Sequence, residues 1–186
     1  MAHEYRAQIV WTRDGGTFTD NGYSRGHVWR FDEGVEVLAS SSPHSVRLPL
    51  SRADAVDPEE ALIAALSSCH MLFFLSFAAK VGFVVDKYED SPVGIMSKNE
   101  HGKLFVSKVT LNPAIVFSSS KRPSPEELDA LHHRAHEECY IANSVRSEVV
   151  VGAWQSVSRT LAWLHMRYLS LTDQDRAADP HHEWDC

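Results

Sequence analysis

Cysteine is scarce in this sequence, with three residues among 186. An odd number of thiols in a chain of this length does not make a disulfide framework, so the fold is not expected to depend on disulfide bonds. No segment combines a basic start, an apolar middle and a small-residue cleavage site, as a secretion signal does. We therefore expect a cytoplasmic protein whose thiols are buried, metal-bound or reactive.

Positive charge is also in deficit. Lysine and arginine number 18 against 25 aspartates and glutamates, which gives a formal net charge of −7. This balance argues against nucleic acid as the main partner, because nucleic acid requires a cationic surface. No lysine precedes Lys80. A cation from the N-terminal half that activates a thiol must therefore be an arginine or a protonated histidine.

The one long apolar run is not expected to cross a membrane. The stretch 61–79 is long enough, but Ser67, Ser68, Cys69 and His70 interrupt it and acidic residues precede it. A helix that is apolar on nearly every face is expected instead in a core or at a subunit interface. A chain of 186 residues is most simply one domain that can bury such a core.

Capping and turn signals predict two long helices among short strands. Asp57 and Pro58 open the first helix, and Gly82 is a suitable stop. Ser124 opens the second helix, and Glu127 completes a capping box. The predicted strands are 5–12, 28–31, 35–40, 83–90, 93–98, 103–117 and 147–151. Strands before and after two helices predict an α+β fold rather than a doubly wound sheet.

Two of the cysteines lie on the predicted helices. Cys69 alone is most simply a small core residue, but Cys139, near the end of the second helix in "CYIANS", changes this interpretation. The two thiols are 139 − 69 = 70 positions apart, so they can meet only if the two helices pack together. Such a pair suits peroxide chemistry, in which one thiolate becomes a sulfenic acid and the other thiol condenses with it.

The second helix also allows a metal site. His132, His136 and Cys139 lie at spacings of four and three, so they share one helical face. With Cys69 or His70 they could form a tetrahedral zinc site, since imidazole and thiolate are suitable ligands. The spacing is not that of a familiar zinc motif, so zinc is the alternative to the redox pair.

Three segments resemble a known family: "VDPEEALIAALSSCHMLFFLSFAAKVGF", "YEDSPVGIM" and "LHHRAHEECYIANSV". Together they resemble the OsmC/Ohr family, named after osmotically inducible protein C and the organic hydroperoxide resistance protein. The resemblance extends from about Tyr5 to Val151, and the two cysteine segments are its specific part. The motifs "YSRGH", beginning at Tyr23, and "SCHM" are most similar to an OsmC-like subgroup.

The resemblance implies antiparallel sheets wrapped around two long central helices in an intertwined homodimer, with two active sites at the subunit interface. It implies a thiol peroxidase, in which Cys69 attacks the O–O bond of an organic hydroperoxide, or of hydrogen peroxide, and becomes a sulfenic acid. Cys139 would then close a disulfide, which a dithiol such as a lipoyl-protein or a small thiol reduces. No metal, haem or flavin cofactor is implied, and neither nucleic acid nor a membrane is an expected partner.

The resemblance also assigns two polar residues to the site. Arg25 corresponds to the arginine that stabilises the thiolate and polarises the peroxide, and Arg13 in "TRDGG" is the competing choice. Glu59 matches the glutamate of the "PE" motif, which holds this arginine, and Glu60 is a weaker alternative. Ten residues of ideal helix separate Glu59 from Cys69 by about 15 Å. Glu59 can therefore reach the thiol only through an extended arginine side chain, unless the helix begins later.

The resemblance does not cover the C-terminal part of the chain. We expect residues 1–151 to form the OsmC-like domain and residues 152–186 to form an extension, with a helix over 154–171 followed by a polar tail. Cys186, at the end of that tail, is not expected to be catalytic. Two other functions stay open: a non-enzymatic module that binds a small molecule or zinc on the same fold, and another thiol-dependent enzyme that uses Cys69 alone.

Overall fold

The structure, a computed structural model, describes residues 2–118, 121–152 and 155–156. The helices are α1 (Pro58–Lys80) and α2 (Pro125–Glu138), with 3-10 turns η1 (Asp32–Gly34) and η2 (Ala142–Ser144). The strands are β1 (Ala7–Val10), β2 (His27–Phe31), β3 (Glu36–Ala39), β4 (Val85–Asp90), β5 (Val93–Lys98), β6 (Leu104–Leu111), β7 (Pro113–Phe117), β8 (Glu148–Val151) and β9 (Gln155–Ser156). The α+β class predicted from the order of elements is therefore confirmed.

The described strands form three three-stranded sheets. The first, β1–β2–β3, is an antiparallel meander. In the other two sheets an antiparallel pair gains a parallel third strand: β9 joins β4–β7, and β8 joins β5–β6. The expectation of purely antiparallel sheets is therefore wrong for β8 and β9. Both strands follow α2, and such a long crossover returns the chain in the direction that parallel pairing requires.

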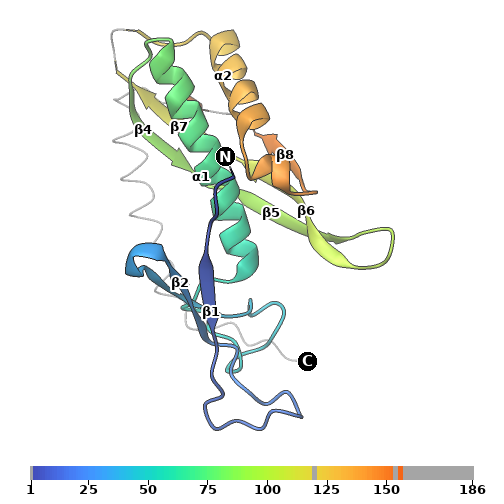
Figure 1. Cartoon of the computed structure of the whole chain (residues 1–186). Helices are drawn as coiled ribbons and strands as arrows, with labels where there is room; N and C mark the ends of the chain where they lie inside the picture. Colours follow the sequence, from blue (N-terminus) through green and yellow to red (C-terminus); the bar gives the residue numbers. More distant parts are fainter. Residues whose placement is uncertain (1, 119–120, 153–154, 157–186) are drawn as a thin grey trace, which may run out of the picture.

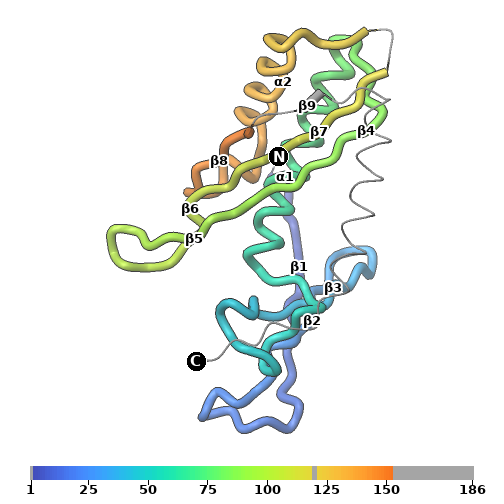
Figure 2. The backbone as a smooth tube through the Cα atoms, turned by 180° about the vertical axis from the view of Figure 1, so that it is seen from behind, coloured from blue at the N-terminus to red at the C-terminus, as the bar shows by residue number. Residues whose placement is uncertain are grey.

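The single strand predicted over 103–117 is divided into β6 and β7 at Asn112. The Asn112 backbone N–H donates to the side chain of Asp90 in β4, at 2.6 Å from Oδ1, rather than to a backbone carbonyl of a neighbouring strand. Pro113 has no N–H to donate, so the ladder is interrupted here. The paired chain is also interrupted between β4 and β5, so β4–β7 and β5–β6 belong to two separate sheets. Figure 2 shows these strands crossing α1 obliquely, with the turn between β5 and β6 projecting away from the helix.

Helix α1 begins where the sequence predicts. Asp57 Oδ1 accepts the Glu60 N–H at 2.8 Å, and the Glu60 carboxylate accepts the Asp57 N–H at 3.3 Å, which is a reciprocal capping box. Pro58 occupies the first turn, where no N–H is needed. Gly82, with a φ of +81°, follows the helix end as expected.

Only one stripe of α1 is buried in this chain. Its buried residues are Leu66, His70, Phe74, Phe77 and Ala78. The other faces are also rich in apolar residues, and Leu72 is 60% exposed. By length and composition α1 could cross a membrane, but the core helix of a soluble protein passes the same test. An apolar helix with one covered face has further surface available for packing.

Two hydrophobic clusters pack against successive halves of α1. The first joins its C-terminal half to α2, β4 and β7 through Phe74, Phe77, Ala78, Phe83, Ile115, Phe117, Leu128, Leu131 and Ala135. The second joins Leu66 to Val106, Val109 and Leu111 of β6. Helix α2 therefore lies beside α1, as Figure 1 shows.

Helix α2 is fixed at both ends by local contacts. Ser124 Oγ accepts the Glu127 N–H at 3.2 Å, and Glu127 Oε2 accepts the Ser124 N–H at 2.8 Å, so the predicted capping box is present. Cys139 is the C-terminal cap, with extended backbone angles and its N–H on His136 O at 3.3 Å. The second thiol therefore lies where the helix ends and the chain turns.

The sheet β1–β2–β3 lies at the N-terminal end of α1, away from α2 (Figures 1 and 2). Before Asp57, the buried residues of the described chain are Ala39, Ser40, Ser42 and Ser51. Large apolar side chains on this sheet are consequently exposed, such as Ile9 at 60%. A sheet normally buries one face against another layer, and in a single chain this one does not.

The helix predicted over 154–171 and the polar tail with Cys186 lie outside the described residues, apart from Gln155 and Ser156. These two residues form β9, which pairs with β7.

Candidate active site

Cys69 lies in the middle of α1 on a half-buried face. It opens into a pocket of about 520 Å³ between α1 and the segment that follows α2. The other residues that line this pocket are Ala65, Ser68, Leu72, Phe73, Ser76, Tyr140 and Ile141. Most of these side chains are apolar, so the pocket suits a molecule with a hydrocarbon part that approaches the Cys69 sulfur.

The structure brings Cys139 next to Cys69, although 70 positions separate them in the sequence. Cys139 is 1% exposed, and both thiols are free. Burial raises the pKa of Cys139 to about 11, and a hydrogen bond with the Cys69 thiol acts in the same direction. The Ala142 N–H donates to Cys139 Sγ at 3.4 Å. Cys139 is therefore a protonated thiol at neutral pH. It is buried, whereas Cys69 lines the pocket.

A pair of buried histidines joins the two helices that carry the thiols. His70, the residue after Cys69, and His132 of α2 are 1% and 3% exposed. Their rings are stacked with 5.3 Å between centroids and 8° between planes, and His70 Nε2 lies 3.0 Å from His132 Nδ1. Burial lowers the pKa of both side chains to about 4. Both imidazoles are therefore neutral at pH 7, and one donates to the other.

The zinc alternative finds no site among the described residues. Within residues 2–118, 121–152 and 155–156, no group of three His, Cys, Asp or Glu side chains could hold a metal ion. His132, which the helical spacing grouped with His136 and Cys139, directs its Nδ1 to His70 instead. The shared face exists, but one of its imidazoles is engaged by the neighbouring helix.

Arg25 lies in the loop between β1 and β2 and does not contact either thiol within the described chain. Its Nη1 donates to Asn21 O at 2.7 Å and also to Tyr23 O, and its guanidinium lies 3.8 Å from the centroid of the Tyr23 ring. Both hydrogen bonds use Nη1, so Nε and Nη2 have no partner among the described residues. The guanidinium is oriented by its own loop and retains donors for another group.

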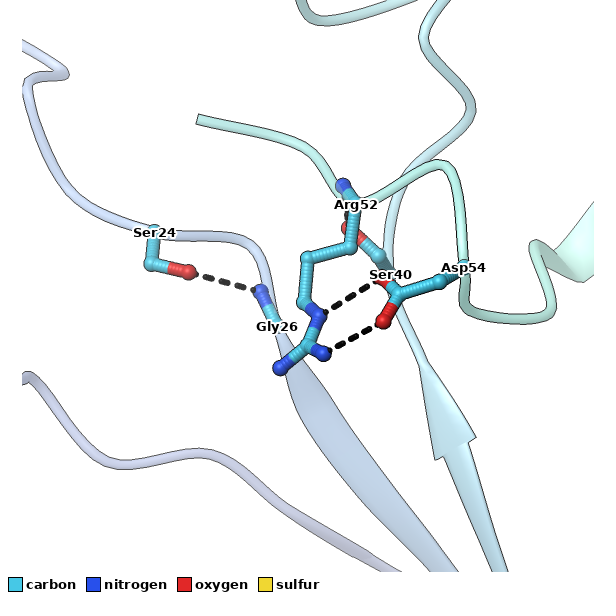
Figure 3. Close-up of polar contacts among 5 residues, drawn as sticks. All are labelled: Ser24, Gly26, Ser40, Arg52 and Asp54. Carbon is cyan, nitrogen blue, oxygen red and sulfur yellow. Dashed lines mark hydrogen bonds and ion pairs between the residues drawn. The ribbon is translucent and has the colours of Figure 1, made fainter. Parts of the chain in front are cut away.

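The chain around Arg25 lies against the segment that leads into α1, and Figure 3 shows Arg52 of that segment beside Gly26. The Arg25 backbone N–H donates to Leu50 O at 2.7 Å. Arg52 donates from its backbone to Ser40 Oγ at 3.1 Å and forms a bidentate pair with Asp54 at 3.0 and 2.7 Å. A Cβ at Gly26 would lie 3.1 Å from Arg52 Cδ. The absence of a side chain at Gly26 therefore lets the two segments approach.

The other polar candidates are separated by the structure. Arg13 lines a different pocket, of about 580 Å³, on the β1–β2–β3 sheet. Glu59 is half-buried in the first turn of α1, and its carboxylate has no hydrogen bond or ion pair among the described residues. Glu60 is engaged by Asp57 in the capping box. Of the four residues assigned to the site, the single chain brings Cys69 and Cys139 together and leaves Arg25 and Glu59 outside that contact.

The His70–His132 contact was not predicted from the sequence. From the sequence, His70, His132 and His136 are predicted only as possible zinc ligands. A usable signal was present, because His70 lies four residues from both Leu66 and Phe74 on the buried stripe of α1. A histidine at such a position requires a buried hydrogen-bond partner.

The fold and this site define a class: an α+β protein with two helix-borne thiols that meet beside an apolar pocket. The family model described as OsmC-like protein matches residues 51–153, more than half of the chain. The chain therefore belongs to the OsmC-like family, which confirms the resemblance seen in the sequence.

Solved structures agree with this assignment. An OsmC-like protein of unknown function from Vibrio cholerae is 53% identical, covers 81% of this chain and 99% of its own, and gives a TM-score of 0.79. An OsmC-like protein from Mycoplasma pneumoniae is 16% identical, with coverages of 84% and 99% and a TM-score of 0.62. An organic hydroperoxide resistance protein OsmC from Legionella pneumophila is also 16% identical, with coverages of 84% and 99% and a TM-score of 0.57. The last two show the fold alone. The comparison with curated proteins gave no match.

Proposed function

We propose that this protein is a thiol-dependent peroxidase that reduces organic hydroperoxides, with hydrogen peroxide as a second substrate, and that Cys69 is the peroxidatic and Cys139 the resolving thiol. The observation that carries the proposal is the contact between the two thiols at the edge of an apolar pocket. Their environments support different roles. Cys69 lines the pocket, whereas Cys139 is buried behind it with a raised pKa, so Cys69 is the thiol that a peroxide can reach.

The reaction has three balanced steps. The Cys69 sulfur attacks the distal oxygen of the O–O bond, the peroxide leaves as an alcohol that takes up one proton, and Cys69 becomes a sulfenic acid. Cys139 then attacks the Cys69 sulfur, and the sulfenic hydroxyl leaves with the Cys139 proton as water. An external dithiol, such as a lipoyl-protein, reduces the Cys69–Cys139 disulfide and is itself oxidised.

The substrate class is supported by the pocket. Leu72, Phe73 and Ile141 offer apolar contacts to the hydrocarbon part of a hydroperoxide, and no charged residue lines the pocket among the described residues. Fold neighbours from Legionella pneumophila and Elizabethkingia anophelis carry the name organic hydroperoxide resistance protein. Both are below 25% identity, so their likeness shows the fold alone, and the substrate class is proposed from the apolar pocket.

A homodimer would complete the site. In one chain, two apolar surfaces are open: the outer faces of α1, including Leu72, and the β1–β2–β3 sheet, on which Ile9 is exposed. A second copy could cover both at once. It could also bring a loop with Arg25 to the pocket of the first, where the free Nε and Nη2 would bind the Cys69 thiolate and the peroxide. Glu59, which is unpaired among the described residues, would hold that arginine.

The same proposal places the protein in a reducing cytoplasm, with neither nucleic acid nor a membrane as a partner. Three cysteines and a net charge of −7 support this setting.

The decisive experiment is stopped-flow consumption of cumene hydroperoxide under excess dihydrolipoamide. Wild type should turn over, and Cys69→Ser should lose nearly all activity. Cys139→Ser should form the sulfenic acid but fail to cycle through a disulfide. Equal rates for wild type and Cys69→Ser would exclude the peroxidatic role. Full turnover in Cys139→Ser with this dithiol would favour a thiol enzyme that uses Cys69 alone. Cys186→Ser is the matched control, with activity expected to remain within twofold.

A further inference from the structure

The buried pair formed by His70 and His132 has no part in the steps described above. It joins α1 to α2 by a hydrogen bond of 3.0 Å between His70 Nε2 and His132 Nδ1. Phe74 stacks on the His132 ring at 4.5 Å between centroids, which fixes the orientation of that imidazole. The contact is therefore a defined, directional link between the two helices that carry the thiols.

The two histidines lie on the same helices as the two thiols. His70 follows Cys69 directly on α1, and His132 precedes Cys139 by seven residues, which is two turns of α2 and about 10 Å along its axis. A shift of one helix along the other would change the histidine contact and the separation of the thiols together. Disulfide formation tolerates little error, because the two Cα atoms must lie within about 4.4–6.8 Å.

Forming this hydrogen bond leaves two buried ring nitrogens without a partner among the described residues, which lowers the stability of the core. These nitrogens are His70 Nδ1 and His132 Nε2. In either tautomer one ring therefore keeps an unpaired donor and the other an unpaired acceptor. Two apolar side chains would fill the same space without this penalty, but they would not fix the register of the helices with a bond of defined length and direction.

We propose that His70 and His132 are positioning residues for the resolving step. Their hydrogen bond would hold α1 and α2 in the register in which Cys139 captures the Cys69 sulfenic acid before a second peroxide oxidises it further. This inference rests on the proposed peroxidase function. It concerns the second step of the cycle and leaves the first step, the attack of Cys69 on peroxide, independent of the pair.

Conservative substitutions can separate positioning from simple core packing. His132→Asn keeps a polar atom near the position of Nδ1, whereas His132→Leu fills the space without a hydrogen bond. In the same way, His70→Gln keeps an atom near Nε2 and His70→Leu does not. His133→Gln is the control, because His133 lies beside His132 on α2 but its side chain is 76% exposed.

The measurement follows both steps in one reaction. Folded protein is mixed with one equivalent of cumene hydroperoxide, quenched at successive times, and analysed by mass spectrometry for dimedone-trapped Cys69 sulfenic acid and for the Cys69–Cys139 disulfide. We expect His132→Leu to form the sulfenic acid within about twofold of the wild-type rate and to close the disulfide about five- to tenfold more slowly, the factor expected for one lost hydrogen bond. His132→Asn should recover most of the closure rate, and His133→Gln should match wild type.

The outcomes separate this inference from the proposed function. If wild type forms no sulfenic acid at Cys69, the peroxidase proposal fails. If wild type forms it and His132→Leu closes the disulfide as fast as wild type, the positioning role is wrong. Equal slowing in His132→Asn and His132→Leu would also overturn it, because packing rather than the hydrogen bond would then matter.

A second measurement covers the case in which the leucine variants do not fold. In wild type, the shared proton of the pair should give an imidazole N–H signal in nitrogen-15 NMR that is protected from solvent exchange. The chemical shift of this signal should change when Cys69 and Cys139 form their disulfide. An unchanged signal in the oxidised protein would show that the pair is not coupled to the thiols and would overturn the proposal.

Discussion

Acid should destabilise this protein through the imidazoles of His70 and His132. Burial lowers the pKa of both to about 4 from the ordinary value of 6.5. For His70, the positive charges that His132 and His136 would carry act in the same direction. For His132, the Asp129 carboxylate opposes the shift only in part. Both rings are thus neutral in the folded protein over a pH range in which they are protonated in the unfolded chain.

The sign and size follow from proton linkage. Between pH 6.5 and 4 the unfolded chain binds more protons than the folded protein, so the free energy of unfolding decreases as the pH falls through this window. With pKa values of 6.5 unfolded and about 4 folded, lowering the pH from 7 to 5 costs about 2 kcal/mol per imidazole and about 4 kcal/mol for the pair. Above pH 6.5 the contribution is constant.

Urea unfolding at pH 7, 6 and 5 measures this effect. The comparison is between wild type and a double variant, His70→Leu with His132→Leu, because other groups contribute the same pH dependence to both proteins. Protein concentration must be fixed, since dimerisation would make the stability depend on it. Wild type should lose about 4 kcal/mol more than the double variant from pH 7 to pH 5, and His133→Gln should behave as wild type. Equal pH dependence in wild type and double variant would refute a buried neutral pair.

Four further predictions follow from single positions. Phe74→Ala should lower the free energy of unfolding by about 3–5 kcal/mol in urea titrations, because it empties a fully buried site; a loss below about 1 kcal/mol would contradict the described core. Asp57→Ala should cost about 1 kcal/mol by removing the cap of α1, and no change would mean that the capping box is not formed in solution. In stopped-flow assays Arg25→Ala should slow the first step at least tenfold while Arg13→Ala stays within twofold, and the reverse pattern would transfer the role to Arg13. Leu72→Asp should convert a dimer to a monomer in sedimentation velocity, whereas a monomeric wild type would contradict the proposed assembly.

The helix boundaries could be predicted because their signals are local. The capping residues of both helices lie within three positions of the groups that they bond, so a short stretch of sequence is sufficient. The break between β6 and β7 could not be predicted in the same way. It depends on Asp90, which is 22 positions from Asn112 and meets it only in the folded sheet. The strand over β8 was predicted, but the parallel pairing of β8 and β9 was not, because pairing with strands that precede α2 depends on the topology.

In the candidate site, too, some contacts could be predicted from the sequence and others depend on how the helices pack. That Cys69 and Cys139 could meet was inferred from two helices that had to pack together, and the structure places their thiols in contact. The contact between His70 and His132 was missed because it requires the rotation of both helices, which spacing along one helix does not give. The assignment of Arg25 and Glu59 came from a family resemblance, and within the described residues of one chain neither side chain contacts Cys69.

The central claim is that Cys69 and Cys139 act as one redox pair. Its most direct test is non-reducing peptide mapping by mass spectrometry after the reduced protein reacts with one equivalent of cumene hydroperoxide. The account predicts a Cys69–Cys139 disulfide as the main product, in an amount equal to the peroxide consumed. A disulfide through Cys186, or peroxide consumption with both thiols still free, would contradict it.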